Sequence, residues 1–195
     1  MRPARVLLLA GLLVFLTAAG RPQPPVYPQI LLGTPLRFPR DHGAHPDFRT
    51  EWWYVTGWLD TGQGPPLGFQ LTFFRSRPAT DQRNPSAFAP RQILFAHAAL
   101  SDPSVGHLLH DQRAARAGFG LAQTSTSDMD VVIDDWSLKR DGGDHIHARV
   151  GGKTFALDLV FAPTQPILLQ GEGGYSRKGR IPGAASAYYL SLIHI

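Results

Sequence analysis

The sequence of 195 residues contains no cysteine. Disulfide bonds, thiol nucleophiles, thiolate metal sites and lipid attachment at an amino-terminal cysteine are therefore excluded, and the chain must be stabilised by its apolar core. A Gly-rich phosphate loop, a Gly-x-Ser-x-Gly elbow and a His-Glu-x-x-His motif are also missing. The sequence accordingly predicts no cofactor and no metal ion.

The amino terminus has the composition of a secretory signal peptide. Arg2 and Arg5 precede the apolar run 6–16, and small residues follow at 17–20. The alternative is a membrane anchor, but the apolar stretch 6–20 is 15 residues long, short of the roughly 20 that a membrane-spanning helix needs. Cleavage near residue 20 predicts a periplasmic or secreted protein that is not a lipoprotein and has no transmembrane span in the mature chain.

A large excess of charge of one sign is absent as well. The 19 basic and 15 acidic residues give a net charge of +4, and removal of Arg2 and Arg5 leaves 17 against 15. Such a balance does not predict nucleic acid as a partner. The basic loop Gly171–Gly179 could bind an anion or serve as a solvated connector.

Short strands joined by turns are the predicted secondary structure, since the 20 glycines and 17 prolines punctuate the chain. Residues 21–40 are rich in proline and predict an extended lead-in. Residues 108–117 fit either a short helix or an irregular strand, and Gly151–Gly152 is expected to form a two-residue hairpin turn. Strands are predicted over 51–60, 67–75, 92–100, 129–138, 146–150, 153–161 and 167–170. The sequence therefore predicts an all-β, mostly antiparallel barrel or sandwich.

The predicted strand 51–60 is aromatic on both faces. Trp53 lies on one face, and Trp52, Tyr54 and Trp58 lie on the other. We therefore expect both faces of this strand to be covered.

Residues 45–54 hold the densest group of polar and aromatic side chains. One interpretation is a pocket rim with titratable groups over an aromatic floor. The other is a loop whose polar side chains bond the backbone, followed by core aromatics. Arg75 ends an apolar strand and, if buried, needs a carboxylate such as Glu51.

Other polar residues suggest weaker candidates. His97 interrupts an apolar strand and is expected to be a satisfied core histidine. His145 and His147 share a strand face, but their setting favours solvent exposure over metal binding. Asp134 and Asp135 are taken as strand neighbours that face opposite ways, so they cannot act as an acid/base pair.

Eight segments in chain order carry a family resemblance. Two of them read His45-Pro-Asp-Phe-Arg-Thr-Glu-Trp-Trp-Tyr-Val-Thr-Gly-Trp58 and Gly68-Phe-Gln-Leu-Thr-Phe-Phe-Arg75. The others are 95–102, 134–138, 157–159, 169–171, 174–179 and 185–189. Together they resemble the AttH-like family, which includes the carotenoid 1,2-hydratases (hydroxyneurosporene synthases).

The resemblance implies a lipocalin-like antiparallel β-barrel over residues 41–189, the first of two barrels in a longer chain. The second barrel would follow downstream, and the sequence is then an amino-terminal fragment. Residues 190–195 depart from the family pattern at Tyr189. They are what a transposon end used in library preparation would encode, and are expected not to be native.

Two functions follow from the resemblance. The first is an exported protein that binds a hydrophobic small molecule or lipid in an aromatic-lined barrel, with an ABC-type transporter as a candidate partner. The alternative is a hydro-lyase of the carotenoid 1,2-hydratase type, which adds water across an isoprenoid C=C bond. Its acid would lie in the downstream half, so no catalytic residue is assigned. The candidate ligand-binding residues are His45, Glu51, Trp52, Trp53, Tyr54, Trp58, Arg75, His97, Tyr175 and Lys178.

Overall fold

The computed structural model describes residues 25–62, 64–181, 183–191 and 193–194. The predicted signal peptide, residues 1–20, lies outside these residues. The chain divides into two compact units, Met1–Val26 with Ala79–Ala89 and Tyr27–Pro78 with Pro90–Ile195. In the first unit, the described residues 79–89 form a loop in which the Asp81 carboxylate accepts a 3.0 Å hydrogen bond from the backbone N–H of Arg83.

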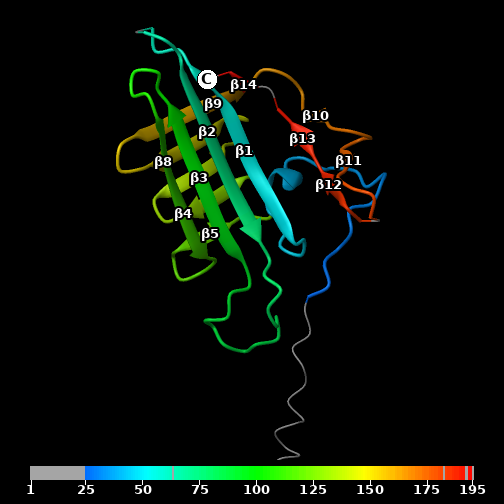
Figure 1. Ribbon diagram of the computed structural model, residues 1–195. Helices are drawn as coiled ribbons and strands as arrows, with labels where there is room; N and C mark the ends of the chain where they lie inside the picture. The colour runs from blue at the N-terminus through cyan, green and yellow to red at the C-terminus, as the bar shows by residue number, and fades with distance from the viewer. Residues whose placement is uncertain (1–24, 63, 182, 192, 195) are drawn as a thin grey trace, which may run out of the picture. The chain divides into compact units, whose positions relative to one another are not determined.

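The larger unit contains a four-stranded antiparallel sheet with the order β1-β2-β3-β4 (Figure 1). Its strands are β1 (Thr50–Leu59), β2 (Leu67–Ser76), β3 (Ile93–Ser101) and β4 (Leu108–Arg116). For residues 108–117 the sequence left a helix or an irregular strand open, and the structure shows a regular strand. Every residue of β4 pairs with one of β3, because the ladder satisfies backbone groups that an isolated short helix would leave to water.

A second antiparallel sheet has the order β14-β9-β8-β7-β6-β5. Its strands are β5 (Ala122–Thr124), β6 (Asp130–Ile133), β7 (Trp136–Arg140), β8 (Ile146–Gly151), β9 (Ala156–Pro163) and β14 (Ile193–His194). Among the described residues the hydrogen-bonded ladders do not join the two sheets into a closed barrel.

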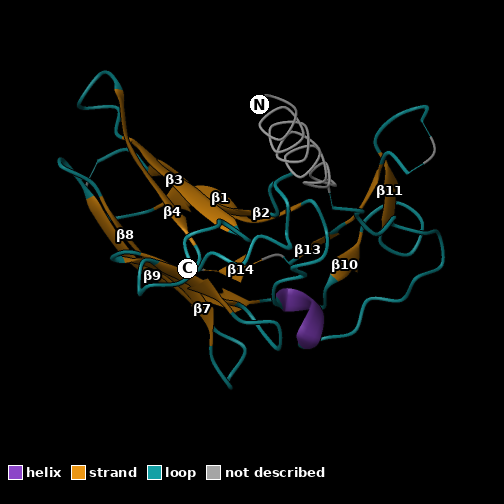
Figure 2. Cartoon of the chain, turned by 90° about the horizontal axis from the view of Figure 1, so that it is seen from below, coloured by secondary structure: helices purple, strands orange, loops and turns teal. Residues whose placement is uncertain are grey.

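The carboxy-terminal arm, residues 164–191, adds two small ladders. β10 (Leu168–Leu169) pairs with β13 (Tyr189–Leu190), and β11 (Tyr175–Arg177) pairs with β12 (Ala185–Ala187). The 3-10 helix η1 (Arg40–His42) lies between the large sheets and this arm (Figures 1 and 2). No helix in the described part of the chain is long and apolar enough to cross a lipid bilayer.

The core lies between the facing sides of the two sheets. Alternate residues of β2 and β3 point inward, and Leu71, Phe73 and Leu94 are completely buried. The rings of Phe69 and Phe161 stack across the sheets with centroids 6.1 Å apart. The Trp136 indole donates to the Gly151 carbonyl at 2.8 Å. The predicted all-β antiparallel fold is confirmed, and its two facing sheets suit a lipocalin-like architecture.

Three details of the predicted strands are wrong. Residues 129–138 do not form one strand, because Asp134 has a φ of 55° and the chain reverses there, so that Ile133 pairs with Trp136. Asp134 and Asp135 are therefore turn residues and not neighbours within a strand. The next hairpin turns at 153–154 instead of Gly151–Gly152, since the N–H of Gly152 bonds the carbonyl of Phe155 at 2.8 Å.

The outer face of the first sheet also differs from expectation. Trp52, Tyr54 and Trp58 are 40%, 47% and 74% exposed, so the described residues do not cover both faces of β1. His97 is exposed on this same outer face beside Phe95, with ring centroids 6.1 Å apart. It is not a core histidine, because inward positions of β3 are occupied by its neighbours Ala96 and Ala98.

Candidate functional site

The helix η1 positions two buried polar side chains next to β1. The Asp41 carboxylate accepts a 2.5 Å hydrogen bond from the backbone N–H of Arg37, which closes the turn that begins the helix. Gly43 ends it, and a Cβ there would lie 3.0 Å from backbone atoms of residues 125, 126 and 128. The N–H of Ala44 then bonds the carbonyl of Ser125 at 2.7 Å. This close approach fixes Asp41 and His42 against the second sheet.

The imidazole of His45 lies between two carboxylates. Its Nδ1 is 3.0 Å from Oε2 of Glu51, and its Nε2 is 3.1 Å from Oδ1 of Asp41. The hydrogen bond to Glu51 raises the pKa of His45. Both ring nitrogens face carboxylate oxygens, so the protonated form of the ring, in which both donate, bridges η1 and β1.

The buried Arg75 forms an ion pair with the partly buried Glu51 across β1 and β2. They are direct register partners, and Nε of Arg75 donates to Oε1 of Glu51 at 2.7 Å. Burial opposes ionisation of Glu51, but the bond from His45 and the charge of Arg75 outweigh it and lower its pKa. The remaining donors of Arg75 bond the carbonyls of Phe48 and His45 at 2.7 and 2.8 Å. The expected partnership of Arg75 with Glu51 is confirmed.

A second pair, between the buried His42 and the partly buried Tyr189, joins η1 to the arm. Nδ1 of His42 is 2.8 Å from the hydroxyl of Tyr189, and Phe38 packs against both rings. Burial lowers the pKa of His42 and raises that of Tyr189. Both groups are therefore neutral near pH 7, and they provide uncharged hydrogen-bonding atoms in an otherwise aromatic environment.

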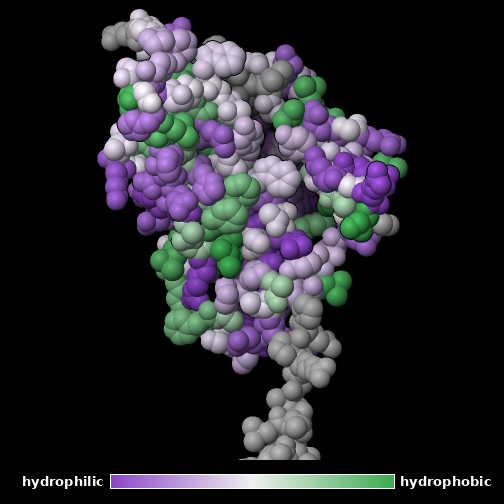
Figure 3. Space-filling view, viewed as in Figure 1, coloured by the Kyte–Doolittle hydropathy of each residue, from purple (hydrophilic) through white to green (hydrophobic). Residues whose placement is uncertain are grey.

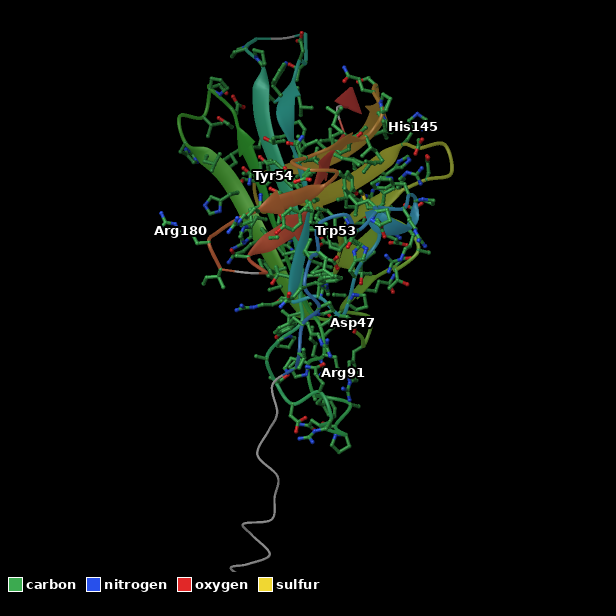
Figure 4. The ribbon with its side chains drawn as sticks, turned by 90° about the vertical axis from the view of Figure 1, so that its right-hand side faces the viewer. Asp47, Trp53, Tyr54, Arg91, His145 and Arg180 are labelled. Carbon is green, nitrogen blue, oxygen red and sulfur yellow. The ribbon has the colours of Figure 1, made fainter. Side chains whose placement is uncertain are left out.

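These groups line a cavity of about 940 Å³ between β1, the inner ends of β6–β8, the lead-in and the arm. Figure 4 looks onto this side of the molecule and labels Trp53 and Tyr54 near the middle of the view. The aromatic and larger apolar lining residues are Ile30, Leu31, Leu36, Phe48, Trp52, Trp53, Tyr54, Val55, Met129, Leu138, Ile146, Ile167, Tyr175, Tyr188, Tyr189 and Leu190. The charged and titratable lining residues include Arg40, Asp41, His42, His45, Glu51, Arg140 and Asp144.

The charges at the cavity are mostly balanced by neighbours. Arg140 bonds Asp128 at 2.7 Å and also pairs with Asp144. Arg40 pairs with Asp41 at 2.6 Å. By contrast, the buried hydroxyl oxygen of Ser186, also in the lining, has no hydrogen-bond partner. Within the part of the chain that is described, no three His, Asp or Glu side chains are grouped as metal ligands.

The structure brings some of the predicted site residues together and separates others. His45, Glu51, Trp52, Trp53, Tyr54 and Tyr175 line the cavity. Trp58 lies near the far end of β1, His97 lies on the outer face, and Arg75 is buried behind Glu51. Lys178 lies outside the lining, with its ammonium 5.4 Å from the Tyr188 ring centroid.

Sequence reasoning missed Asp41, His42, Tyr189 and Arg140. Asp41 and His42 lie in an aperiodic stretch. His42 bonds Tyr189, 147 positions away, and the N–H of Ala44 holds the same segment against Ser125. The only available indication was Tyr189, which closes the last segment of the family resemblance.

Comparison with known proteins supports that resemblance. The family model described as AttH-like matches residues 29–194. A crystal structure of a Nitrosomonas europaea protein assigned as AttH superposes with a TM-score of 0.74 and is 49% identical. The match covers 83% of this chain and 48% of that one, so the present chain spans about half the length of that relative. No curated protein matches the chain.

Proposed function

Since this chain belongs to the AttH-like family and shares its lipocalin-like β-fold, we propose that it is an exported protein that binds a hydrophobic lipid or isoprenoid ligand in the cavity beside β1. Removal of residues 1–20 would deliver it to the periplasm or the medium. Amino-terminal sequencing of secreted material tests this part, and a mature protein that retains Met1 would contradict it.

The observation that carries the proposal is the cavity itself. Its volume of about 940 Å³ falls within the roughly 300–1,000 Å³ of small-molecule sites in proteins, which combine apolar walls with a few polar groups. Trp52, Tyr54 and Tyr188 provide flat aromatic walls. The ring centroids of Trp52 and Tyr188 lie 6.3 Å apart. Long apolar chains pack well against such surfaces.

Polar atoms at the same cavity would orient the ligand. The neutral pair His42–Tyr189 and the unpartnered hydroxyl of Ser186 can each bond a hydroxyl, carbonyl or ester group. The walls thus provide affinity for an apolar chain, and these few atoms select its polar end.

The hydratase alternative gains less support from this part of the molecule. Protonation of an alkene needs a carboxyl group that an apolar site keeps neutral. Asp41 and Glu51 at the cavity have lowered pKa values because hydrogen bonds and cations stabilise their charged forms. They are therefore ionised near neutral pH, which suits a binding site better than this acid role.

Solvent extraction and mass spectrometry of the purified chain test the proposal, together with displacement of a fluorescent fatty acid. Trp52→Ala removes a cavity wall and is expected to weaken binding by roughly 10-fold or more, as for loss of about 1.5–3 kcal/mol of apolar contact. Trp58→Ala is the matched control, since Trp58 lies on the same face of the same strand outside the cavity.

Equal affinities of the two variants, or no bound apolar ligand, would contradict the proposal. Formation of a tertiary alcohol from an acyclic carotenoid would support the alternative.

A further inference from the structure

Two segments of the larger unit carry an excess of basic residues and no acidic ones. Residues 27–40 contain Arg37 and Arg40, and residues 173–190 contain Arg177, Lys178 and Arg180. Their 5 positive charges exceed the net +4 of the whole sequence, so the remaining residues, with 14 basic and 15 acidic side chains, carry −1. The positive charge of the chain is thus concentrated on the lead-in and the arm.

The three cations of the arm lack acidic partners. Arg177, Lys178 and Arg180 are all exposed, and no described carboxylate lies within ion-pair distance of them. The Arg177 side chain bonds the carbonyls of Gly179 and Arg180 at 2.9 and 3.4 Å. In Figure 4 the labelled Arg180 projects outward from the arm. These charges remain available to an anionic surface, unlike Arg40 and Arg140 at the cavity.

Two turns in the same segments expose large apolar side chains. The carbonyl of Leu31 accepts from Thr34 across a turn with a φ of 81° at Gly33, and Leu31 and Leu32 are 60% and 56% exposed. Ile181 begins a second such turn, closed by the N–H of Ala184, and is 76% exposed. Turn residues are usually Gly, Pro, Asn, Asp or Ser, so apolar residues on both turns are unusual.

Residues that flank the first turn contact the arm at the edge of the cavity. A Cβ added at Gly183 would lie 3.6 Å from the side chain of Gln29, and one at Gly174 would lie 3.1 Å from Leu36. Residues 29–36 therefore run along the arm, and Leu31 and Gly183 both line the cavity. We call Leu31, Leu32, Arg177, Lys178, Arg180 and Ile181 the basic rim. Figure 3 shows strongly hydrophilic and strongly hydrophobic residues side by side at the margin formed by β11 and β12.

We propose that the basic rim docks the protein on the surface of an anionic lipid membrane, with the cavity edge facing the lipid. Lys and Arg side chains are attracted to anionic headgroups, and exposed apolar side chains among them enter the headgroup boundary. Charge complementarity favours this partner, because the three cations without carboxylate partners gain an electrostatic interaction at an anionic surface and none at a neutral one. The proposal goes beyond ligand binding and does not depend on it, but it places a lipid source next to the cavity.

Co-sedimentation of the whole chain with vesicles tests the proposal. We expect binding to vesicles of phosphatidylcholine in which about 30% of the lipid is phosphatidylglycerol, enough for a negative surface potential. Vesicles of pure phosphatidylcholine should bind little of the protein. Binding should weaken as salt rises, because screening shortens the reach of the charges. Since each cation near an anionic surface contributes roughly fivefold in affinity, the triple variant R177Q/K178Q/R180Q should bind roughly 100-fold more weakly.

A matched triple variant controls for net charge. K139Q/R149Q/K153Q removes three exposed cations from the β7–β9 region and should bind as the unchanged chain does. Ile181→Ser should weaken binding further at high salt, where the apolar contacts dominate. Equal loss in both triple variants, equal binding to neutral vesicles, or binding to soluble heparin that vesicles cannot displace would each overturn the proposal. Salt dependence of the unchanged chain remains informative if the first variant does not fold, and extraction of a bound ligand reports separately on the cavity.

Discussion

The guanidinium of Arg75 is completely buried and donates to Glu51 across 2.7 Å, at the point where β2 and β1 pair in register. Arg75 also bonds carbonyls of the loop 45–48, so that one side chain fixes both the strand pair and the loop. This arrangement supports the interpretation of a loop held by polar side chains for residues 45–49, which form part of the cavity wall, but of the aromatics that follow only Trp53 is a core residue.

Arg75→Met should lower the free energy of unfolding by about 3–5 kcal/mol, because it leaves the partly buried Glu51 with one cation fewer and several carbonyls without donors. Denaturant unfolding at pH 7 measures the loss. Arg149→Met is the control, since Arg149 and Asp158 form an exposed pair at 3.6 Å that should contribute less than about 1 kcal/mol. Similar losses in the two variants would show that Arg75 acts as an ordinary surface cation.

The bridge made by His45 predicts a dependence of stability on pH. Its pKa is raised above the usual histidine value of 6.5, so its contribution is fully present below pH 6.5 and is lost as the pH rises through the folded-state pKa. Glu51 and Asp41 have lowered pKa values relative to 4.5 and 3.8. Their contributions are present above these values and are lost in more acidic solution.

Comparison of the unchanged chain with His45→Gln tests this prediction. The difference in unfolding free energy should be largest between about pH 5 and pH 6.5 and should shrink steadily at higher pH, because neutral His45 can donate to only one of the two carboxylates. His147→Gln is a control for an exposed histidine that contacts Asp141. A constant difference from pH 6 to pH 9 would mean that His45 is not protonated in the fold.

Of the first sheet, β1, β2 and β3 could be predicted, most clearly β2, whose apolar residues alternate with a period of two, whereas β4 was left open between a helix and an irregular strand. The sequence also indicated the pairing of Arg75 with a carboxylate, since an arginine in an apolar strand needs one. The predicted residues that line the cavity lie on β1 and in the loop before it, apart from Tyr175 in the arm. His42 and Tyr189 are 147 positions apart, and no local periodicity links a 3-10 turn to a two-residue strand in the arm.

Gly43 should be required for its size. Its φ of −79° suits any residue, but an added Cβ would lie 3.0 Å from backbone atoms that cannot move aside. Gly43→Ala is expected to destabilise the protein by about 1–3 kcal/mol and to displace η1 from the second sheet. Gly142→Ala is the control, because nothing lies within 4 Å of its added Cβ, and thermal unfolding compares the two. Unchanged stability in Gly43→Ala would contradict the close approach.

Asp134 should tolerate only residues that accept a left-handed backbone. Its φ of 55° is easily reached by Gly and Asn, whereas a β-branched residue is strained there. We expect Asp134→Asn to be nearly neutral and Asp134→Val to cost about 1–2 kcal/mol. Denaturant unfolding of both variants gives the comparison. If valine were as stable as asparagine, the β6–β7 turn would have a different geometry.

This turn also shows why one strand was predicted where two exist. The run 129–138 reads as continuous because Val131, Ile133, Trp136 and Leu138 are all apolar and all buried. The period of two breaks between Ile133 and Trp136, which are three positions apart, and the left-handed backbone of Asp134 lies at this break. The exposed aromatics of β1 were misjudged for a related reason, since composition does not say which neighbours cover a sheet face.

The four tryptophans form two pairs with opposite surroundings: Trp53 and Trp136 are 7% and 0% exposed, whereas Trp52 and Trp58 are 40% and 74% exposed. The intrinsic fluorescence of the protein should therefore be a sum of a blue emission that iodide cannot quench and a redder emission that it can. Because Trp52 lines the cavity and Trp58 does not, an occupant of the cavity should remove only part of the quenchable emission. The indoles thus provide a label-free optical titration in which one exposed tryptophan reports and the other serves as its internal reference.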